Sequence, residues 1–118
     1  MKPGTTGITR IIHASGYSMK GLQAAWKYEA AFRQEVILLI LLSMVTFSLP
    51  VDKYEQIALI GSLVLVVIVE LINSAIEAVV DRTGSEWHEL SGRAKDIGSA
   101  AVFITLALAA LIWTVILL

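Results

Sequence analysis

Residues 97–118 contain no ionisable side chain and are almost entirely apolar. A helix needs ~20 such residues to cross the hydrocarbon core of a membrane, because each residue advances it by ~1.5 Å. Two more apolar stretches, 36–49 and 57–80, precede this one. The first is too short to span, so we expect its helix to begin earlier, near Glu29. The sequence therefore predicts three transmembrane helices, over residues 29–49, 57–80 and 97–118.

The composition agrees with a membrane protein. Of the 118 residues, 57% are hydrophobic and 16% are charged, and the mean hydropathy is +0.77. A small soluble domain could not hide so many apolar side chains. The length predicts a single domain over residues 1–118, and we expect no cleavable signal peptide. A net charge of −1 and the absence of cysteine argue against a nucleic-acid partner, a disulfide framework and a thiolate metal site.

An amphipathic helix is expected ahead of the first span, over residues 8–28. Its apolar residues recur at offsets of three and four, which places them on one face, while cationic residues fall elsewhere. This pattern favours a helix lying in the lipid headgroup region, although an ordinary soluble amphipathic helix shares it. The apolar face consists of Ile8, Ile11, Ile12, Ser15, Met19, Leu22 and Trp26.

The distribution of Lys and Arg predicts the orientation in the membrane. If the amino terminus is inside, eight of the nine Lys and Arg residues lie on the inner side, and only Lys53 lies outside. Cytoplasmic segments carry the excess of positive charge in membrane proteins. We therefore expect the amino end and a loop over residues 81–96 to face the cytoplasm.

Polar residues interrupt the second apolar stretch at helical spacing. They follow one another at offsets of 0, +3, +4, +7 and +11, which form one stripe that we expect to face a single neighbour or cavity. Ionisable groups inside a membrane helix are costly and usually functional. The stripe consists of Glu70, Asn73, Ser74, Glu77 and Asp81.

The predicted topology brings charged groups from all three spans to one level at the inner surface. Glu29 and Glu77 could hold Mg²⁺ and leave positions for phosphate oxygens. Glu70, deeper in the membrane, could act as a general base. The alternative is that the acids only pair with cations to hold the helices in register. Cations available for such pairs, or for neutralising a polyphosphate, are Arg10, Arg33, Arg93 and Lys95.

Two strings of residues resemble the prokaryotic diacylglycerol kinase family. One is Glu-Leu-Ile-Asn-Ser-Ala-Ile-Glu over residues 70–77, and the other is Gly-Arg-Ala-Lys-Asp over residues 92–96. Earlier segments, such as Glu-Ala-Ala-Phe-Arg-Gln-Glu over residues 29–35, look similar too. The resemblance implies an all-α homotrimeric membrane kinase with sites shared between subunits. Such an enzyme transfers phosphate from MgATP directly to the hydroxyl of diacylglycerol, giving phosphatidate, in the bacterial inner membrane.

The resemblance also implies roles for individual residues. Glu70 would be the general base with Asn73 beside it, and Glu29 and Glu77 would ligate Mg²⁺. ATP would contact Arg10, Tyr17, Glu29, Glu77, Glu86, Trp87, His88, Lys95 and Asp96. The lipid substrate would contact Arg10, Ala14, Ser15, Gly16, Tyr17, Ser18, Met19, Gln23, Ala24, Ala25, Trp26, Ala31, Phe32, Arg33, Gln34, Glu35, Ser48, Leu49, Pro50, Val51, Gln56, Glu70 and Ser99.

Other functions share some of these features. An undecaprenol kinase would use the same chemistry on a different lipid alcohol. A small proton-coupled exporter is also a short chain with a membrane Glu, but such proteins generally have four spans and one central acid. A structural membrane subunit would tolerate Glu70→Gln without any loss of activity.

Overall fold

The computed structural model describes residues 6–82 and 88–118, and within these ranges the chain forms four helices and no strand. The all-α prediction is therefore confirmed for the described residues. The helices are α1 (Gly7–Tyr28), α2 (Ala30–Thr46), α3 (Lys53–Asp81) and α4 (Glu89–Leu117).

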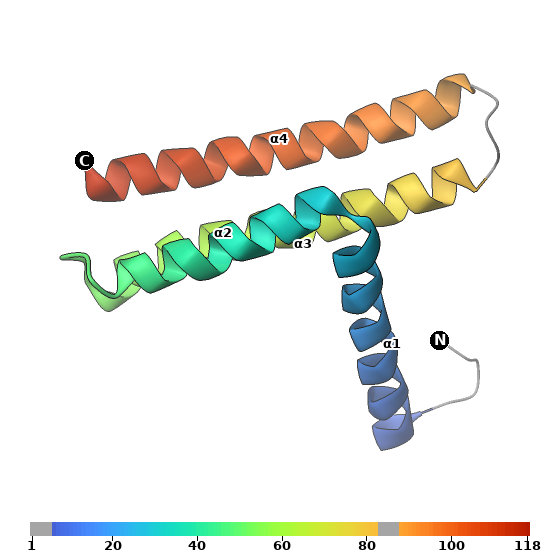
Figure 1. Ribbon diagram of the computed structural model, residues 1–118, viewed down its shortest axis with the longest axis horizontal. Helices are drawn as coiled ribbons and strands as arrows, with labels where there is room; N and C mark the ends of the chain where they lie inside the picture. Colours follow the sequence, from blue (N-terminus) through green and yellow to red (C-terminus); the bar gives the residue numbers. More distant parts are fainter. Residues whose placement is uncertain (1–5, 83–87) are drawn as a thin grey trace.

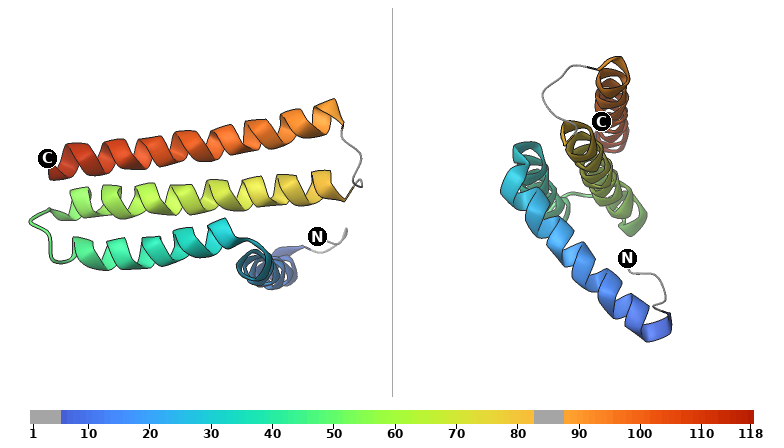
Figure 2. Two further views of the ribbon diagram at one scale, coloured as in Figure 1. Left: turned by 45° about the horizontal axis from the view of Figure 1, so that its top comes forward. Right: turned by 90° about the vertical axis from the view of Figure 1, so that its right-hand side faces the viewer.

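The helices α2, α3 and α4 lie side by side, and α1 extends away from them (Figure 1). α3 packs between α2 and α4, and α1 leaves the start of α2 at a steep angle to all three (Figures 1 and 2). α3 and the beginning of α4 continue past the corner between α1 and α2 (Figure 1). The corner therefore lies beside the carboxyl-terminal half of α3, where the polar stripe is found.

α3 begins earlier than the apolar stretch that predicts it. Asp52 caps the helix, because its Oδ1 atom accepts from the Glu55 backbone N–H at 2.8 Å. The Glu55 carboxylate in turn accepts from the Asp52 N–H at 3.0 Å. This reciprocal pair is a capping box, and it makes the charged residues 53–56 the first turn of the helix. The connection between the first two predicted spans is thus shorter in the structure.

α4 also begins earlier than expected. His88 caps it, since the Nδ1 atom of its ring accepts from the Leu90 N–H at 3.1 Å. The loop predicted over residues 81–96 is therefore wrong for residues 89–96, which are helical. The polarity of this segment indicated a loop, but a helix that projects beyond the apolar region can carry the same charges. One example is the exposed pair of Arg93 and Glu89, whose N and O atoms are 3.4 Å apart.

Hydrogen bonds join the helices at the end of the bundle far from α1. The indole Nε1 of Trp113 on α4 donates to the carbonyl oxygen of Leu59 at 3.1 Å and to Ser62 Oγ at 3.2 Å. Gln56 Nε2 on α3 donates to Thr46 Oγ1 at the end of α2, at 3.1 Å. Leu59 and Thr46 are the most deeply buried side chains described in the chain. These contacts fix the order of the three helices.

α3 and α4 are each long and apolar enough to cross a membrane. Most of their apolar side chains are exposed, unlike those of the core helices of soluble proteins, and the only buried residues of α4 are Gly98 and Ala109. Exposed apolar surface on this scale is typical of contact with lipid or another chain. These observations support a membrane protein. α2, with 17 residues, is shorter than a typical span, so the third span over residues 29–49 stays a prediction.

Candidate active site

Glu29 forms the corner between α1 and α2. Its backbone is extended (φ −115°, ψ 103°), so the helix stops at Tyr28 and starts again at Ala30. Arg33, one turn later, bends back over the end of α1, and its Nη1 atom donates to the carbonyls of Trp26 at 2.7 Å and Lys27 at 3.2 Å. A cation at the carboxyl end of a helix satisfies carbonyls that have no partner within the helix. Arg33 therefore fixes this corner.

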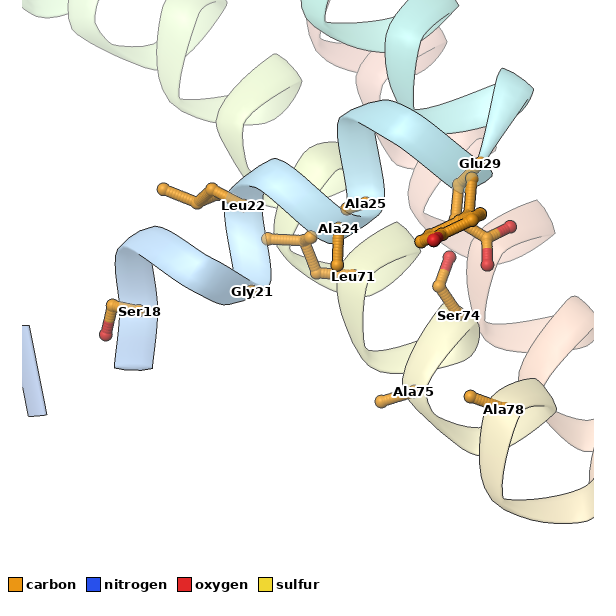
Figure 3. A pocket seen from close by; sticks show the side chains of 11 residues that line it. Ser18, Gly21, Leu22, Ala24, Ala25, Glu29, Leu71, Ser74, Ala75 and Ala78 are labelled. Atoms are coloured by element: carbon orange, nitrogen blue, oxygen red, sulfur yellow. The ribbon is translucent and has the colours of Figure 1, made fainter. Parts of the chain in front are cut away.

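A pocket of about 660 Å³ lies between α1, the corner and α3 (Figure 3). Small and apolar residues form most of its wall, and Ser74 points from α3 toward Glu29. The pocket is therefore an apolar space with polar groups at one end, as expected of a site for an amphipathic ligand. It is lined by Ser18, Gly21, Leu22, Ala24, Ala25, Tyr28, Glu29, Leu71, Ser74, Ala75 and Ala78.

The polar stripe of α3 faces two neighbours. Glu70 and Ser74 are directed to the side of α1 and α2, where Ser74 lines the pocket and its Oγ donates to Glu70 Oε2 at 3.4 Å. Asn73 lies against Gly98 of α4, and Asp81 pairs with Lys95 of α4. The expectation of a single neighbour or cavity was therefore wrong. The stripe is wide enough around the helix to reach both sides of α3.

Glu70 meets a second carboxyl group from α2. The carboxyl groups of Glu35 and Glu70 are close enough to interact electrostatically. The Oε2 atom of Glu35 is buried and has no hydrogen-bond partner in the described part of the chain. Ser74 lies between this pair and the pocket. A proton-accepting group is thus placed at the edge of the apolar space.

Asn73, Glu77 and Lys95 form a second polar group, between α3 and α4. Asn73 Nδ2 donates to Glu77 Oε1 at 2.9 Å. Lys95 Nζ is 3.0 Å from Asp81 Oδ1 and is also attracted by the negative charge of Glu77. Two acids and a cation from separate helices therefore meet where α3 ends.

A single chain buries the deeper part of the stripe. Glu70, Asn73 and Ser74 are only 6%, 8% and 7% exposed. These three residues therefore need no neighbouring subunit to shield them. Glu77 is half-buried and Asp81 is exposed, so only the end of the stripe is open to another molecule.

Carboxylates that could receive a magnesium ion together with its nucleotide stand at single positions on either side of α3. No group of three or more His, Asp or Glu side chains that could hold a metal exists among the described residues. Mg²⁺ commonly binds through only one or two carboxylates and completes its shell with water and substrate phosphates. Glu29 at the corner and Glu77 on α3 are carboxylates of this kind.

Other residues predicted for the site lie in separate places. Tyr17 and Arg10 lie on α1 and are exposed. Asp96 and Ser99 are exposed on α4, and His88 uses its Nδ1 atom as the helix cap. The segment 48–51 lies at the far end of α2, about 20 Å from Glu35 by the rise of an α-helix. Glu86 and Trp87 lie outside the described residues.

The sequence analysis missed part of the pocket wall. Leu71, Ala75 and Ala78 were not singled out, nor were Gly21 and Tyr28. A signal for two of them was present, because Ala75 and Ala78 lie three residues apart on the face that also carries Ser74. Small residues at this spacing permit another helix to approach closely.

Comparison with known proteins identifies the family. The sequence model described as "Prokaryotic diacylglycerol kinase" matches residues 16–117. The chain belongs to the prokaryotic diacylglycerol kinase family. The diacylglycerol kinase of Escherichia coli (strain K12) is 58% identical over 117 residues, which cover 99% of this chain and 96% of the relative. That of Haemophilus influenzae is 52% identical over 92% of each chain, and that of Pseudomonas aeruginosa is 50% identical over 98% and 94%.

Proposed function

We propose that this protein is a diacylglycerol kinase, which transfers the γ-phosphate of ATP to the free hydroxyl of 1,2-diacylglycerol and produces phosphatidic acid. Family membership supports the reaction, since relatives that match nearly the whole chain carry this name. The observation that carries the chemistry is the buried Glu70, which meets the half-buried Glu35 beside an apolar pocket. A lipid alcohol needs both an apolar site and a base close to its hydroxyl.

Glu70 is the proposed general base. The lipid hydroxyl oxygen attacks the γ-phosphorus, its proton passes to the carboxylate at Glu70, and ADP leaves. Glu35 supports this role because its carboxyl group lies close to that of Glu70 and would help to set its position. Ser74, at 3.4 Å from Glu70 Oε2, holds the carboxylate from the other side. The transfer is direct, so no phosphorylated residue forms on the protein.

Charged groups at the end of α3 and the start of α4 are proposed to receive MgATP. Glu29 and Glu77 would bind the magnesium ion that arrives with the nucleotide. Lys95, and Arg10 on α1, would offset the negative charge of the phosphates, which is the main task of protein groups in phosphoryl transfer. Tyr17, His88 and Asp96 would contribute further nucleotide contacts, and so would Glu86 and Trp87.

The lipid would lie along α2. Its headgroup would be held at the corner, near Glu35 and Ala25. Its acyl chains would run toward residues 48–51 and Gln56 at the other end of α2. A path of about 20 Å is long enough for an acyl chain, because one leaflet of a ~30 Å hydrocarbon core is only ~15 Å thick.

The protein would lie in the bacterial inner membrane with the corner and the start of α4 on the cytoplasmic side. This orientation follows from the excess of Lys and Arg at that side. α1 would then lie along the membrane surface, as its steep angle to the other helices suggests (Figure 1). The exposed apolar faces of α2 and α4 leave room for the subunit contacts of a homotrimer.

The test is transfer of labelled phosphate from MgATP to lipid by the purified protein in mixed micelles. Diacylglycerol and undecaprenol are offered in parallel, with a lipid lacking the free hydroxyl as the control. We expect labelled phosphatidic acid and no labelled protein band. Product from undecaprenol alone would reassign the substrate, and a labelled protein during turnover would refute direct transfer.

A further inference from the structure

Gly98 of α4 occupies an unusual position in the bundle. It is one of only two buried residues of α4, and it faces the side chain of Asn73 on α3. A Cβ atom added at this position would overlap Asn73 Oδ1 and lie 3.3 Å from Asn73 Cγ. The next atom, Ile76 Cδ1, is 3.8 Å away, which is an ordinary van der Waals distance. The amide of Asn73 therefore fills the space that any other residue at position 98 would need.

The amide of Asn73 is held by one hydrogen bond and by the limited space beside Gly98. Its Nδ2 atom donates to Glu77 Oε1 at 2.9 Å. Its Oδ1 atom is buried and has no hydrogen-bond partner in the described part of the chain. The Oδ1 atom of the amide thus occupies the space beside Gly98, and the Nδ2 atom is oriented by its hydrogen bond to Glu77. A residue that moved the amide would also remove the donor that orients the Glu77 carboxylate.

We propose that Gly98 is a positioning residue for the nucleotide-bound metal. The absence of a side chain at position 98 seats the Asn73 amide, and the amide in turn orients the Glu77 carboxylate. This inference rests on the proposed role of Glu77 as a metal ligand. Loss of a group that orients a metal ligand typically lowers the metal affinity by about 10- to 100-fold. A methyl group on Gly98 would therefore weaken metal binding although it lies on another helix.

Gly61 provides a matched control. It lies in the interior of α3, and an added Cβ would meet no atom within 4 Å. Gly61→Ala and Gly98→Ala make the same chemical change in a membrane helix, and both raise helix propensity by ~1 kcal/mol. They differ in whether the new methyl group displaces Asn73. A difference in metal affinity between the two variants is thus caused by the contact with Asn73 and not by the loss of a glycine.

The experiment measures Mn²⁺ binding to the purified protein in detergent, by the electron paramagnetic resonance signal of the free ion. A non-hydrolysable ATP analogue is present, so the readout does not depend on turnover. We expect Gly98→Ala to raise the dissociation constant of Mn²⁺ by ~10-fold and Gly61→Ala to leave it unchanged. Asn73→Ala should weaken binding to a similar extent, because it also removes the donor to Glu77.

The double variant Asn73→Ala/Gly98→Ala decides whether Gly98 acts through Asn73. With the amide gone, the methyl group has space, so the double variant should bind Mn²⁺ as tightly as Asn73→Ala alone. Unchanged binding in Gly98→Ala, or a further ~10-fold loss in the double variant, would overturn the inference while leaving the kinase function intact. A wild-type protein that binds no Mn²⁺ with the nucleotide would overturn both this inference and the metal site.

Discussion

Arg33→Met tests whether the corner between α1 and α2 is held as the structure indicates. Methionine keeps much of the apolar length of the side chain but cannot donate to the carbonyls of Trp26 and Lys27. Hydrogen bonds from a charged donor are worth ~1.5–3 kcal/mol each when buried. Arg33 is half-buried, so we take ~1 kcal/mol for each bond and expect α1 to lose ~2 kcal/mol of local stability.

Hydrogen–deuterium exchange of the protein in detergent measures this loss directly. A loss of ~2 kcal/mol corresponds to ~30-fold faster exchange of the amides in the last turns of α1. Amides in the middle of α3 should exchange as in the wild type, because Arg33 makes no hydrogen bond to that helix in the described part of the chain.

Arg93→Met is the matched control. Arg93 also bonds to a nearby group, Glu89 at 3.4 Å, but both side chains are exposed and lie on one helix. Such a pair contributes ~0.5 kcal/mol or less, so exchange in α1 should not change. Equal exchange of α1 in Arg33→Met and the wild type would refute the assigned role of Arg33 at this corner.

Two further substitutions address the nucleotide side and the far end of the bundle. Glu77→Gln should raise the Mg²⁺ concentration needed for half-maximal activity ~10-fold or more, since an amide is a poorer metal ligand than a carboxylate. An unchanged Mg²⁺ requirement would remove Glu77 from the metal site. Trp113→Phe should lower the unfolding free energy in detergent by ~1–2 kcal/mol, because the donor to Leu59 and Ser62 is lost. The kcat should stay the same, and a fall in kcat at unchanged stability would contradict a purely structural role for Trp113.

The sequence predicted the helices well because hydrophobic periodicity and length are local signals. It misplaced the starts of α3 and α4 because capping residues allow a helix to begin within a polar segment. The Asp52 and Glu55 pair follows a spacing that is readable in the sequence, whereas the imidazole cap of His88 has no common sequence signature. A polar segment was therefore taken for a loop over residues 89–96.

The candidate site was only partly predictable for a different reason. Helical spacing placed Glu70, Asn73 and Glu77 on one stripe but could not show that the stripe divides between two neighbours. The pairing of Glu35 with Glu70 joins two helices, so no spacing within one helix reveals it. The contact between Gly98 and Asn73 likewise depends on the register of α3 against α4, which no pattern within one helix reveals.

The central claim is that the buried Glu70 carboxylate accepts the proton of the lipid hydroxyl, and comparing Glu70→Gln with Glu55→Gln tests it most directly. Both residues lie on α3, but Glu55 belongs to the capping box, where glutamine can replace glutamate. Phosphate transfer from MgATP to diacylglycerol should fall by ~10²–10⁴-fold in Glu70→Gln and stay near the wild-type rate in Glu55→Gln. A folded Glu70→Gln protein with the wild-type rate would contradict the account.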